Sequence, residues 1–548
     1  MRVAVLAKFV PAPQGTPELG ADHLLVRTAA DATLDPGDEY AVEAALRVAE
    51  AAGGEVTVVS MGPPEAMTAV RKAISMGAHS GVLVSDPALR GADVLATARV
   101  LAATLRRGSY DLVVGGVEST DGYTGTLPIT VAELLGLPGL TFARSVTVDG
   151  TTVRVERQTE DGYDVITAPL PAVVTVTGSA AEPRYPTLKG IMAAKQKPVE
   201  QLTLADLGIA ATDVAPTHRG PARRGEGAAV TAVWVWAELG ADGVHPSAFE
   251  LLAKARALGT ASAVALGPGA TAAAAELGAH GATTVYAADD AVFGDGLSQP
   301  AAHVLHRLID EHRPDLLLFP TTYDARDVAG RLQARTGSTL LANAVDLPAP
   351  DRAETRIDGG ARIVVTALEG PAPRLVLVRP KSFVAEAVGA TATVVAVPAD
   401  VPDDLRRATR VERHREAAAG PRLEQAKVVV AGGRGLGEAA RFELLERLAG
   451  ILGDAAVGAT RAVVDAGWVP YARQIGQTGK TVKPEVYLAF GISGATQHLV
   501  GMQASKRVVA VNKDADAPIF ALADLGVVGD ALDLLPRLIA ELEARRGS

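Results

Sequence analysis

An internal repeat constrains the fold of this 548-residue chain more than any other feature of its sequence. Three short motifs recur: Gly62-Pro63 as Gly267-Pro268, Gly77-Ala78 as Gly281-Ala282, and Asp111-Leu112-Val113-Val114 as Asp315-Leu316-Leu317-Leu318. Their offsets are 205, 204 and 204 residues. Both copies alternate predicted helices (41–51 and 248–258) with short apolar strands (56–60 and 262–266), a pattern typical of right-handed βαβ units. The repeat therefore predicts two duplicated parallel-sheet α/β domains.

Two composition breaks separate the copies from each other and from a third domain. Residues 217–227 are rich in Gly, Pro and Arg without apolar periodicity, and residues 398–421 are charged. We predict an α/β protein with domains at 1–212, 229–400 and 422–548, a linker at 213–228 and a hinge at 401–421. The length accommodates several buried cores.

Composition excludes several kinds of protein. The chain has no cysteine, so it forms no disulfide, cysteine-ligated iron–sulfur cluster or cysteinyl flavin link. Its net charge of −10 gives no general attraction for nucleic acid or anionic membranes. Residues 1–10 are predicted to be a first strand rather than a signal segment, because Lys8 interrupts the short apolar run. We expect a soluble, cytoplasmic protein without a metal site or catalytic residues.

Two polar, glycine-rich runs lie near the C-terminus, Gln474-Ile-Gly-Gln-Thr-Gly-Lys480 and Gly491-Ile-Ser-Gly-Ala-Thr-Gln-His498. A short apolar stretch, 486–490, separates them. A strand with polar loops at its ends presents backbone N–H groups and hydroxyls to a phosphorylated cofactor. The segment 432–437 is not the dinucleotide fingerprint, because its glycines 433, 435 and 437 alternate.

These runs, followed by Val511-Asn-Lys-Asp514, resemble the FAD domain of electron transfer flavoprotein α subunits. The segment 458–467 looks like the flavin-facing segment of that family, which more often has Ser at the position of Thr460. The first copy is similar to the β subunit, through Leu170-Pro-Ala-Val-Val174 and Glu182-Pro-Arg-Tyr-Pro-Thr-Leu188. The chain thus resembles a natural fusion of β then α, in which a tether raises the effective concentration of the halves.

The resemblance implies a non-covalent FAD in the C-terminal domain. His498 is expected near the N1 and C2 carbonyl edge of the flavin, Thr478 near N5 and Arg461 against the ring. A fixed donor or cation there would stabilise the negative charge of a flavin that accepts single electrons. Lys480 is not counted as a ligand. The full expected set is Arg434, Thr460, Arg461, Gln474, Gly476, Gln477, Thr478, Ser493, Gly494, Gln497, His498, Asn512, Lys513 and Asp530.

A second nucleotide, AMP, is expected at strand ends of the first copy. The expected residues are Ala7, Met61, Ser119, Thr120, Asp121, Gly122, Thr124 and Gly125. The loop lacks the acidic run common in AMP-binding relatives and is shorter than the bifurcating version, so a second FAD and an empty site stay open. The cognate loop of the second copy, 321–327, is expected to have lost nucleotide binding and to face the flavin domain.

The resemblance also implies partners. Residues 182–195, anchored by Leu188, resemble the loop that grips acyl-CoA dehydrogenases and similar flavoproteins, and the acceptor would be a membrane quinone oxidoreductase. Gln158 stands where the family often has a Glu that pairs with the flavin-side arginine, and Glu160 is a possible substitute. The predicted function is an electron carrier whose FAD domain swings between partners. The alternatives are a bifurcating NADH-oxidising protein with two FAD and a non-redox adenine-nucleotide sensor.

Overall fold

The computed structural model describes residues 1–12, 18–22, 24–27, 32–214, 232–240, 242–357, 362–415, 421–476 and 479–546. By compactness the chain forms two units. The first holds Met1–Gln158, Tyr163–Thr355 and Val364–His414, and the second holds Thr159–Gly162, Arg356–Ile363 and Arg415–Ser548. Among the described residues, every helix is too short or too polar to cross a bilayer.

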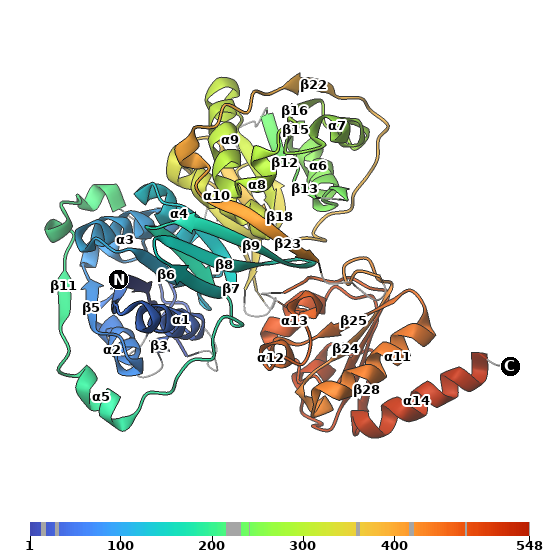
Figure 1. The fold of residues 1–548 in the computed structure, drawn as a ribbon. Helices are drawn as coiled ribbons and strands as arrows, with labels where there is room; N and C mark the ends of the chain where they lie inside the picture. Colours follow the sequence, from blue (N-terminus) through green and yellow to red (C-terminus); the bar gives the residue numbers. More distant parts are fainter. Residues whose placement is uncertain are drawn as a thin grey trace. The chain divides into compact units, whose positions relative to one another are not determined.

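The first copy forms one ten-stranded sheet (Figure 1). Its order is β11 (Val199–Leu202), β5 (Ser80–Val84), β4 (Glu55–Met61), β1 (Arg2–Leu6), β6 (Leu112–Gly116), β10 (Ala172–Val176), β7 (Gly139–Asp149), β8 (Thr152–Thr159), β9 (Gly162–Pro169) and β23 (Thr409–Arg415). The strands from β11 to β7 pair in parallel, and β8 returns antiparallel to β7.

The second copy repeats this order in nine strands. They run β20 (Arg362–Ala367), β19 (Arg352–Ile357), β18 (Leu340–Ala349), β21 (Arg374–Val378), β17 (Leu316–Pro320), β12 (Ala232–Trp236), β15 (Thr260–Leu266), β16 (Thr284–Ala288) and β22 (Thr393–Ala396). Read from β22 back to β20, this order corresponds strand by strand to that of the first sheet from β11 to β9. Strand β12 thus takes the place of β1, and β17 takes the place of β6. The predicted duplication is therefore confirmed at the level of sheet topology.

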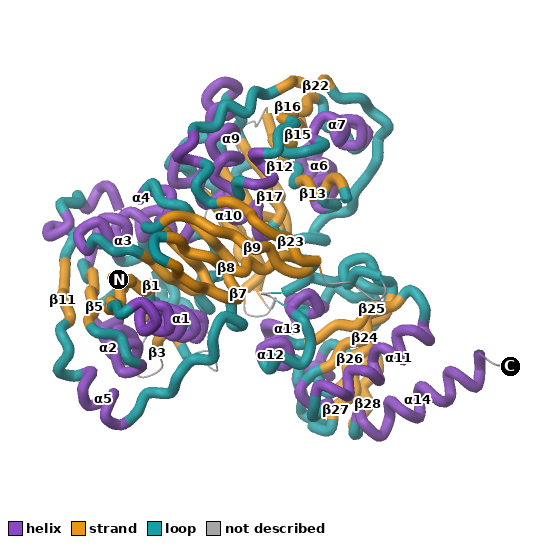
Figure 2. Tube along the Cα trace, in the orientation of Figure 1, coloured by secondary structure: helices purple, strands orange, loops and turns teal. Residues whose placement is uncertain are grey.

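Helices cover both faces of each sheet (Figure 2). The first copy has α1 (Pro36–Ala52), α2 (Met67–Met76), α3 (Val94–Gly108), α4 (Leu127–Leu135) and α5 (Leu188–Ala194), and the second has α6 (Ser247–Leu258), α7 (Ala270–Ala279), α8 (Val292–Asp295), α9 (Ser298–His312) and α10 (Tyr323–Thr336). In β1, Val3 and Val5 face one core cluster while Ala4 and Leu6 face another. This two-sided burial explains why the strands are continuously apolar.

Buried ion pairs join the two copies within the first unit, where α4 packs against α10. Arg157 on β8 is fully buried and lies 2.7 Å from the carboxylate of Asp324 and 3.3 Å from that of Asp327. Between these two helices, Arg331 of α10 lies 2.6 Å from Glu133 of α4. In each of these pairs, one residue belongs to the first copy and the other to the second. Each copy therefore supplies counter-ions to the other.

The predicted linker and the predicted hinge differ in what the structure shows of them. Most of the expected linker 213–228 lies outside the described residues. Part of the expected hinge 401–421 is a strand, β23, which adds to the free edge of β9 in the sheet of the first copy. The chain therefore returns to its first domain after completing the second.

The C-terminal domain is a five-stranded parallel sheet in the second unit. Its order is β25 (Ala455–Ala459), β24 (Val428–Gly432), β26 (Val486–Phe490), β27 (Val508–Asn512) and β28 (Leu525–Val528). Its helices are α11 (Phe442–Leu452), α12 (Arg461–Asp465), α13 (Thr496–Met502) and α14 (Ala531–Arg546). Because β25 and β26 flank β24, the strand order reverses between β24 and β26.

Candidate functional site

The residues expected to hold FAD follow the carboxyl ends of all five strands of the C-terminal sheet. Arg434 follows β24, Thr460 follows β25, Ser493 follows β26, Asn512 ends β27 and Asp530 follows β28. Parallel strands place their carboxyl ends at one edge, and ligands bind there where the strand order reverses. The topology brings these five residues to such an edge.

Glycines let the loops after β24 and β26 touch. The amide of Gly433 donates to the carbonyl of Phe490 at 3.1 Å, and the amide of Gly435 donates to the carbonyl of Gly491 at 3.0 Å. A Cβ at position 435 would lie 2.6 Å from the Cα of Gly491. Two of the alternating glycines that do not fit the dinucleotide fingerprint, Gly433 and Gly435, are thus needed for loop packing.

The side chains exposed at this edge suit an anionic ligand. Ser493, Gln497 and Arg434 are exposed. A guanidinium and hydroxyl group beside backbone amides match the donors that bind a pyrophosphate. The chemistry of the residues present therefore fits FAD.

Other expected ligands have protein partners. The Nε of Arg461 lies 3.1 Å from Asp465, one turn along α12, and its side chain is 42% exposed. The ammonium of Lys513 lies 2.7 Å from Asp530, and the Asn512 amide donates to the carbonyl of Ile492. Lys480, which was not expected to be a ligand, pairs with Glu424.

The described residues 474–476 pack against α13. Gln474 is buried, and a Cβ on Gly476 (φ 144°) would lie 2.7 Å from the carbonyl of Gln497. Gly494 (φ 83°) has the same constraint, because a Cβ there would overlap the backbone of Ile519. Gln477 and Thr478 lie outside the described residues, so their expected roles stay predictions.

His498 points into the domain, where both of its ring nitrogens are engaged. Its Nδ1 lies 2.9 Å from the carbonyl oxygen of Ile475, and its Nε2 lies 2.9 Å from the hydroxyl of Tyr487. The side chain is 5% exposed. Burial lowers the pKa of His498 to about 4, although the Ile475 carbonyl opposes this. Burial and the two hydrogen bonds therefore favour a neutral His498 ring at pH 7. Its expected place at the N1 and C2 carbonyl edge of the flavin stays a prediction.

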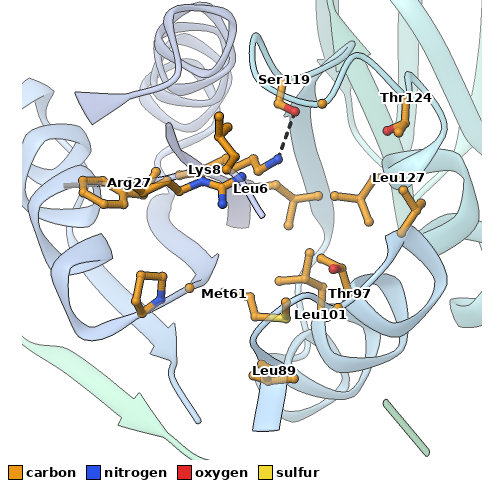
Figure 3. A pocket seen from close by; sticks show the side chains of 18 of the residues that line it. Leu6, Lys8, Arg27, Met61, Leu89, Thr97, Leu101, Ser119, Thr124 and Leu127 are labelled. Carbon is orange, nitrogen blue, oxygen red and sulfur yellow. Dashed lines mark hydrogen bonds between the residues drawn. The ribbon is translucent and has the colours of Figure 1, made fainter. Parts of the chain in front are cut away.

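The first copy contains a cavity of about 920 Å³ at the carboxyl ends of β1, β4 and β6 (Figure 3). Leu6, Met61, Leu101 and Leu127 form apolar walls, while Lys8 and Arg27 supply positive charge. Six of the eight residues expected to bind AMP line it: Ala7, Met61, Ser119, Gly122, Thr124 and Gly125. An apolar cavity with a few charged groups is typical of small-molecule sites.

The other two expected residues, Thr120 and Asp121, hold the loop in place. Thr120 donates through its amide and hydroxyl to Asp35, at 2.7 and 2.8 Å. Asp121 lies 2.6 Å from Lys8 and 2.5 Å from Arg27. Burial raises the pKa of Asp121, but the two cations outweigh it and keep the carboxyl ionised. These residues position the loop rather than line the cavity.

The second copy has filled the equivalent space. Phe319 on β17 stands where the first copy has Gly115, and Trp236 on β12 stands where it has Leu6; their ring centroids lie 6.3 Å apart. Helix α10 begins at Tyr323, whereas the equivalent helix α4 begins only at Leu127. The first copy thus replaces about two helical turns with the loop that borders its cavity.

Comparison with known proteins agrees with this geometry. A family model described as electron transfer flavoprotein domain matches residues 22–207 and again 233–403. A second, described as electron transfer flavoprotein FAD-binding domain, matches residues 422–503. The chain belongs to the electron transfer flavoprotein family.

Curated relatives match the two parts of this flavoprotein separately. The α subunit from Mycobacterium leprae is 42% identical over 302 residues, covering 54% of this chain and 94% of the relative. The α subunit from Mycobacterium tuberculosis is 45% identical over 300 residues, covering 54% and 94%. The β subunit from Mycobacterium bovis is 43% identical over 225 residues, covering 40% and 85%. This flavoprotein is a fusion of a β-like and an α-like part.

A patch of exposed apolar side chains surrounds Leu188 in this flavoprotein. Leu188 is 78% exposed at the start of α5, with Tyr185, Ile191 and Met192 also exposed. Below the patch, Arg184 lies 2.7 Å from Glu43 and 2.6 Å from Glu50, and Thr187 caps the helix. The sequence indicated Leu188, but the structure adds the other members of the patch.

Gln158 has a partner within the first unit. Its amide donates to the hydroxyl of Tyr323 at 3.0 Å, and its side chain is buried. Gln158 therefore takes part in the contact between the two copies. The neighbouring Asp161 pairs instead with Arg422 at 3.4 Å, inside the second unit.

Sequence reasoning missed several residues that shape these sites. Lys8, Arg27 and Asp35 hold the loop 119–126, and Tyr487 contacts His498. A signal existed only for Lys8, because it interrupts an otherwise apolar first strand. The others are distant in sequence from the motifs that they support.

Proposed function

We propose that this flavoprotein is a cytoplasmic electron carrier that takes single electrons from dehydrogenases of the acyl-CoA type and passes them to a quinone oxidoreductase. The observation that carries the proposal is the set of exposed donors at the strand ends of a domain that matches the FAD-binding family model. Bound FAD would supply the one-electron chemistry. The protein would act as a carrier rather than an enzyme.

The chain's own residues would bind and orient that FAD. Arg434 and Ser493 would bind the pyrophosphate, because both are exposed where the strand order reverses. Arg461 would place a guanidinium beside the ring, and Asp465 fixes its direction from the next helical turn. Lys513 and Asp530, at neighbouring strand ends, would bracket the adenosine end.

The nucleotide cavity of the first copy would hold AMP. Its apolar walls suit an adenine, and Lys8 and Arg27 suit a phosphate. The volume of about 920 Å³ lies near the upper end of the roughly 300–1,000 Å³ usual for such sites. A second FAD is therefore the alternative that the cavity size favours.

Cofactor stoichiometry and electron acceptance test the proposal together. We expect gentle denaturation of the purified protein to release one FAD and one AMP per chain, and an acyl-CoA dehydrogenase with its substrate to reduce the bound FAD. Two FAD per chain would point to the bifurcating alternative. A colourless protein with adenine nucleotide alone would point to the non-redox sensor.

The exposed patch around Leu188 provides the test of partner docking. Replacing Leu188 with Ala should lower the rate of reduction by the dehydrogenase at least tenfold while chemical reduction by dithionite stays unchanged. Leu525→Ala, an exposed leucine of the C-terminal domain, is the matched control. Equal rates for the two variants would exclude the patch as the docking site.

A further inference from the structure

The contacts of His498 determine where its protons lie. The Ile475 carbonyl can only accept a hydrogen bond, so Nδ1 of His498 carries a proton. Nε2 then either accepts from the Tyr487 hydroxyl or, in the charged ring, donates to it. Tyr487 is 0% exposed and His498 is 5% exposed. In this setting the neutral ring is favoured, because a buried charge without a counter-ion is costly.

Tyr487 is suited to the role of donor. Burial raises the pKa of Tyr487, which favours the protonated hydroxyl. It lies on β26, whereas His498 lies on α13, and 2.9 Å separates their polar atoms. The hydrogen bond therefore ties the strand of the cofactor edge to the helix that follows it.

We propose that Tyr487 is a positioning residue of the FAD site: together with the Ile475 carbonyl, it holds His498 as a fixed, neutral Nδ1–H ring. His498 then brings no positive charge to the flavin, and the cation beside the ring is Arg461. The inference rests on the FAD site of the proposed function. It does not depend on which protein donates the electrons.

Ring-nitrogen NMR of histidine tests the proposal in the FAD-bound protein. His498 is the only histidine in residues 415–548, and its signals are assigned from their loss in His498→Gln. In ¹⁵N-histidine-labelled protein between pH 6 and 8, we expect a protonated Nδ1 and an unprotonated Nε2. A doubly protonated ring or an Nε2–H tautomer overturns the proposal.

Removing the hydroxyl gives the second measurement. In Tyr487→Phe the Nε2 resonance should move downfield, since it loses its donor, and the dissociation constant for FAD should rise about tenfold. Tyr471→Phe, which removes the other tyrosine hydroxyl of residues 415–548, should leave the Nε2 resonance unmoved. An unmoved Nε2 resonance in Tyr487→Phe contradicts the positioning role.

The outcome separates this inference from the proposed function. If acyl-CoA dehydrogenases fail to reduce the protein while the NMR result holds, the donor is wrong and the role of Tyr487 stands. If reduction proceeds but Nε2 is protonated in the wild type, the role of Tyr487 is wrong and the function stands.

Discussion

At the scale of single residues, the FAD-binding domain depends on glycines that allow backbone to approach backbone. Gly494 has φ 83°, and a Cβ there would overlap the backbone of Ile519. Gly450, in α11, has no atom within 4 Å of such a Cβ. One glycine is thus required by its surroundings and the other is not.

Gly494→Ala should therefore destabilise the domain and weaken FAD binding at least tenfold, because backbone must shift to accept the methyl group. Gly450→Ala is the matched control and should stabilise its helix by about 0.5–1 kcal/mol. Thermal unfolding and fluorescence titration of FAD measure both effects. Equal behaviour of the two variants would contradict the steric argument.

The buried ring of His498 makes the domain sensitive to acid. Its pKa is about 4 in the folded state, against an ordinary value of 6.5. The folded state favours the neutral ring, so the contribution of His498 to the free energy of unfolding is complete above pH 6.5. It is lost as the pH falls toward 4, and the loss amounts to about 3 kcal/mol. Hydrogen exchange in β24 and β26 of the apoprotein at pH 7 and pH 5 should show this loss, and His498→Gln should lack it.

At the scale of elements, one loop distinguishes the two copies. Residues 119–126 border a cavity in the first copy, whereas the equivalent residues of the second copy begin helix α10. The filled space of the second copy contains Trp236 and Phe319 in place of Leu6 and Gly115. The presence of the cavity thus depends on a few side chains on a shared framework.

Leu6→Trp should fill the cavity of the first copy, as Trp236 fills the equivalent space of the second. We expect the purified variant to retain its FAD and to lose at least nine-tenths of its nucleotide, because the indole occupies the apolar wall of the cavity. Leu6→Met conserves volume and should keep the nucleotide. Chromatography of the released nucleotides measures both, and a nucleotide-loaded Leu6→Trp protein would show that the ligand binds elsewhere.

Periodicity and repeated motifs predicted the duplicated sheets, because these depend on local sequence. The glycine-rich runs and their family resemblance indicated the cofactor edge. The inward direction of His498 was not predictable, since it depends on Tyr487 from a neighbouring strand. Asp121 was expected to bind nucleotide, but its partners Lys8 and Arg27 are about a hundred residues away in sequence. Tertiary contacts of this kind leave no pattern in a single sequence.

At the scale of the whole molecule, buried charges hold the two copies together. Arg157 is 2% exposed between Asp324 and Asp327 of the other copy. Breaking a buried ion pair from one side leaves uncompensated charge. The interface therefore tolerates loss of this arginine poorly.

Arg157→Met should lower the free energy of unfolding by about 3–5 kcal/mol. Arg144→Met, which removes a partly exposed arginine paired with Glu156 on the same hairpin, should cost about 1 kcal/mol or less. Denaturant unfolding compares the two. A small loss for Arg157→Met would mean that the pair contributes little to the interface.

Strand β23 has a consequence for how the protein is made. It completes the edge of β9, yet roughly 240 residues separate Pro169 from Thr409. At about 5–20 residues per second, the ribosome takes roughly 10–50 s to supply it. During that interval the nascent first domain exposes an unpaired strand edge, the kind of surface that chaperones protect and that aggregates when crowded.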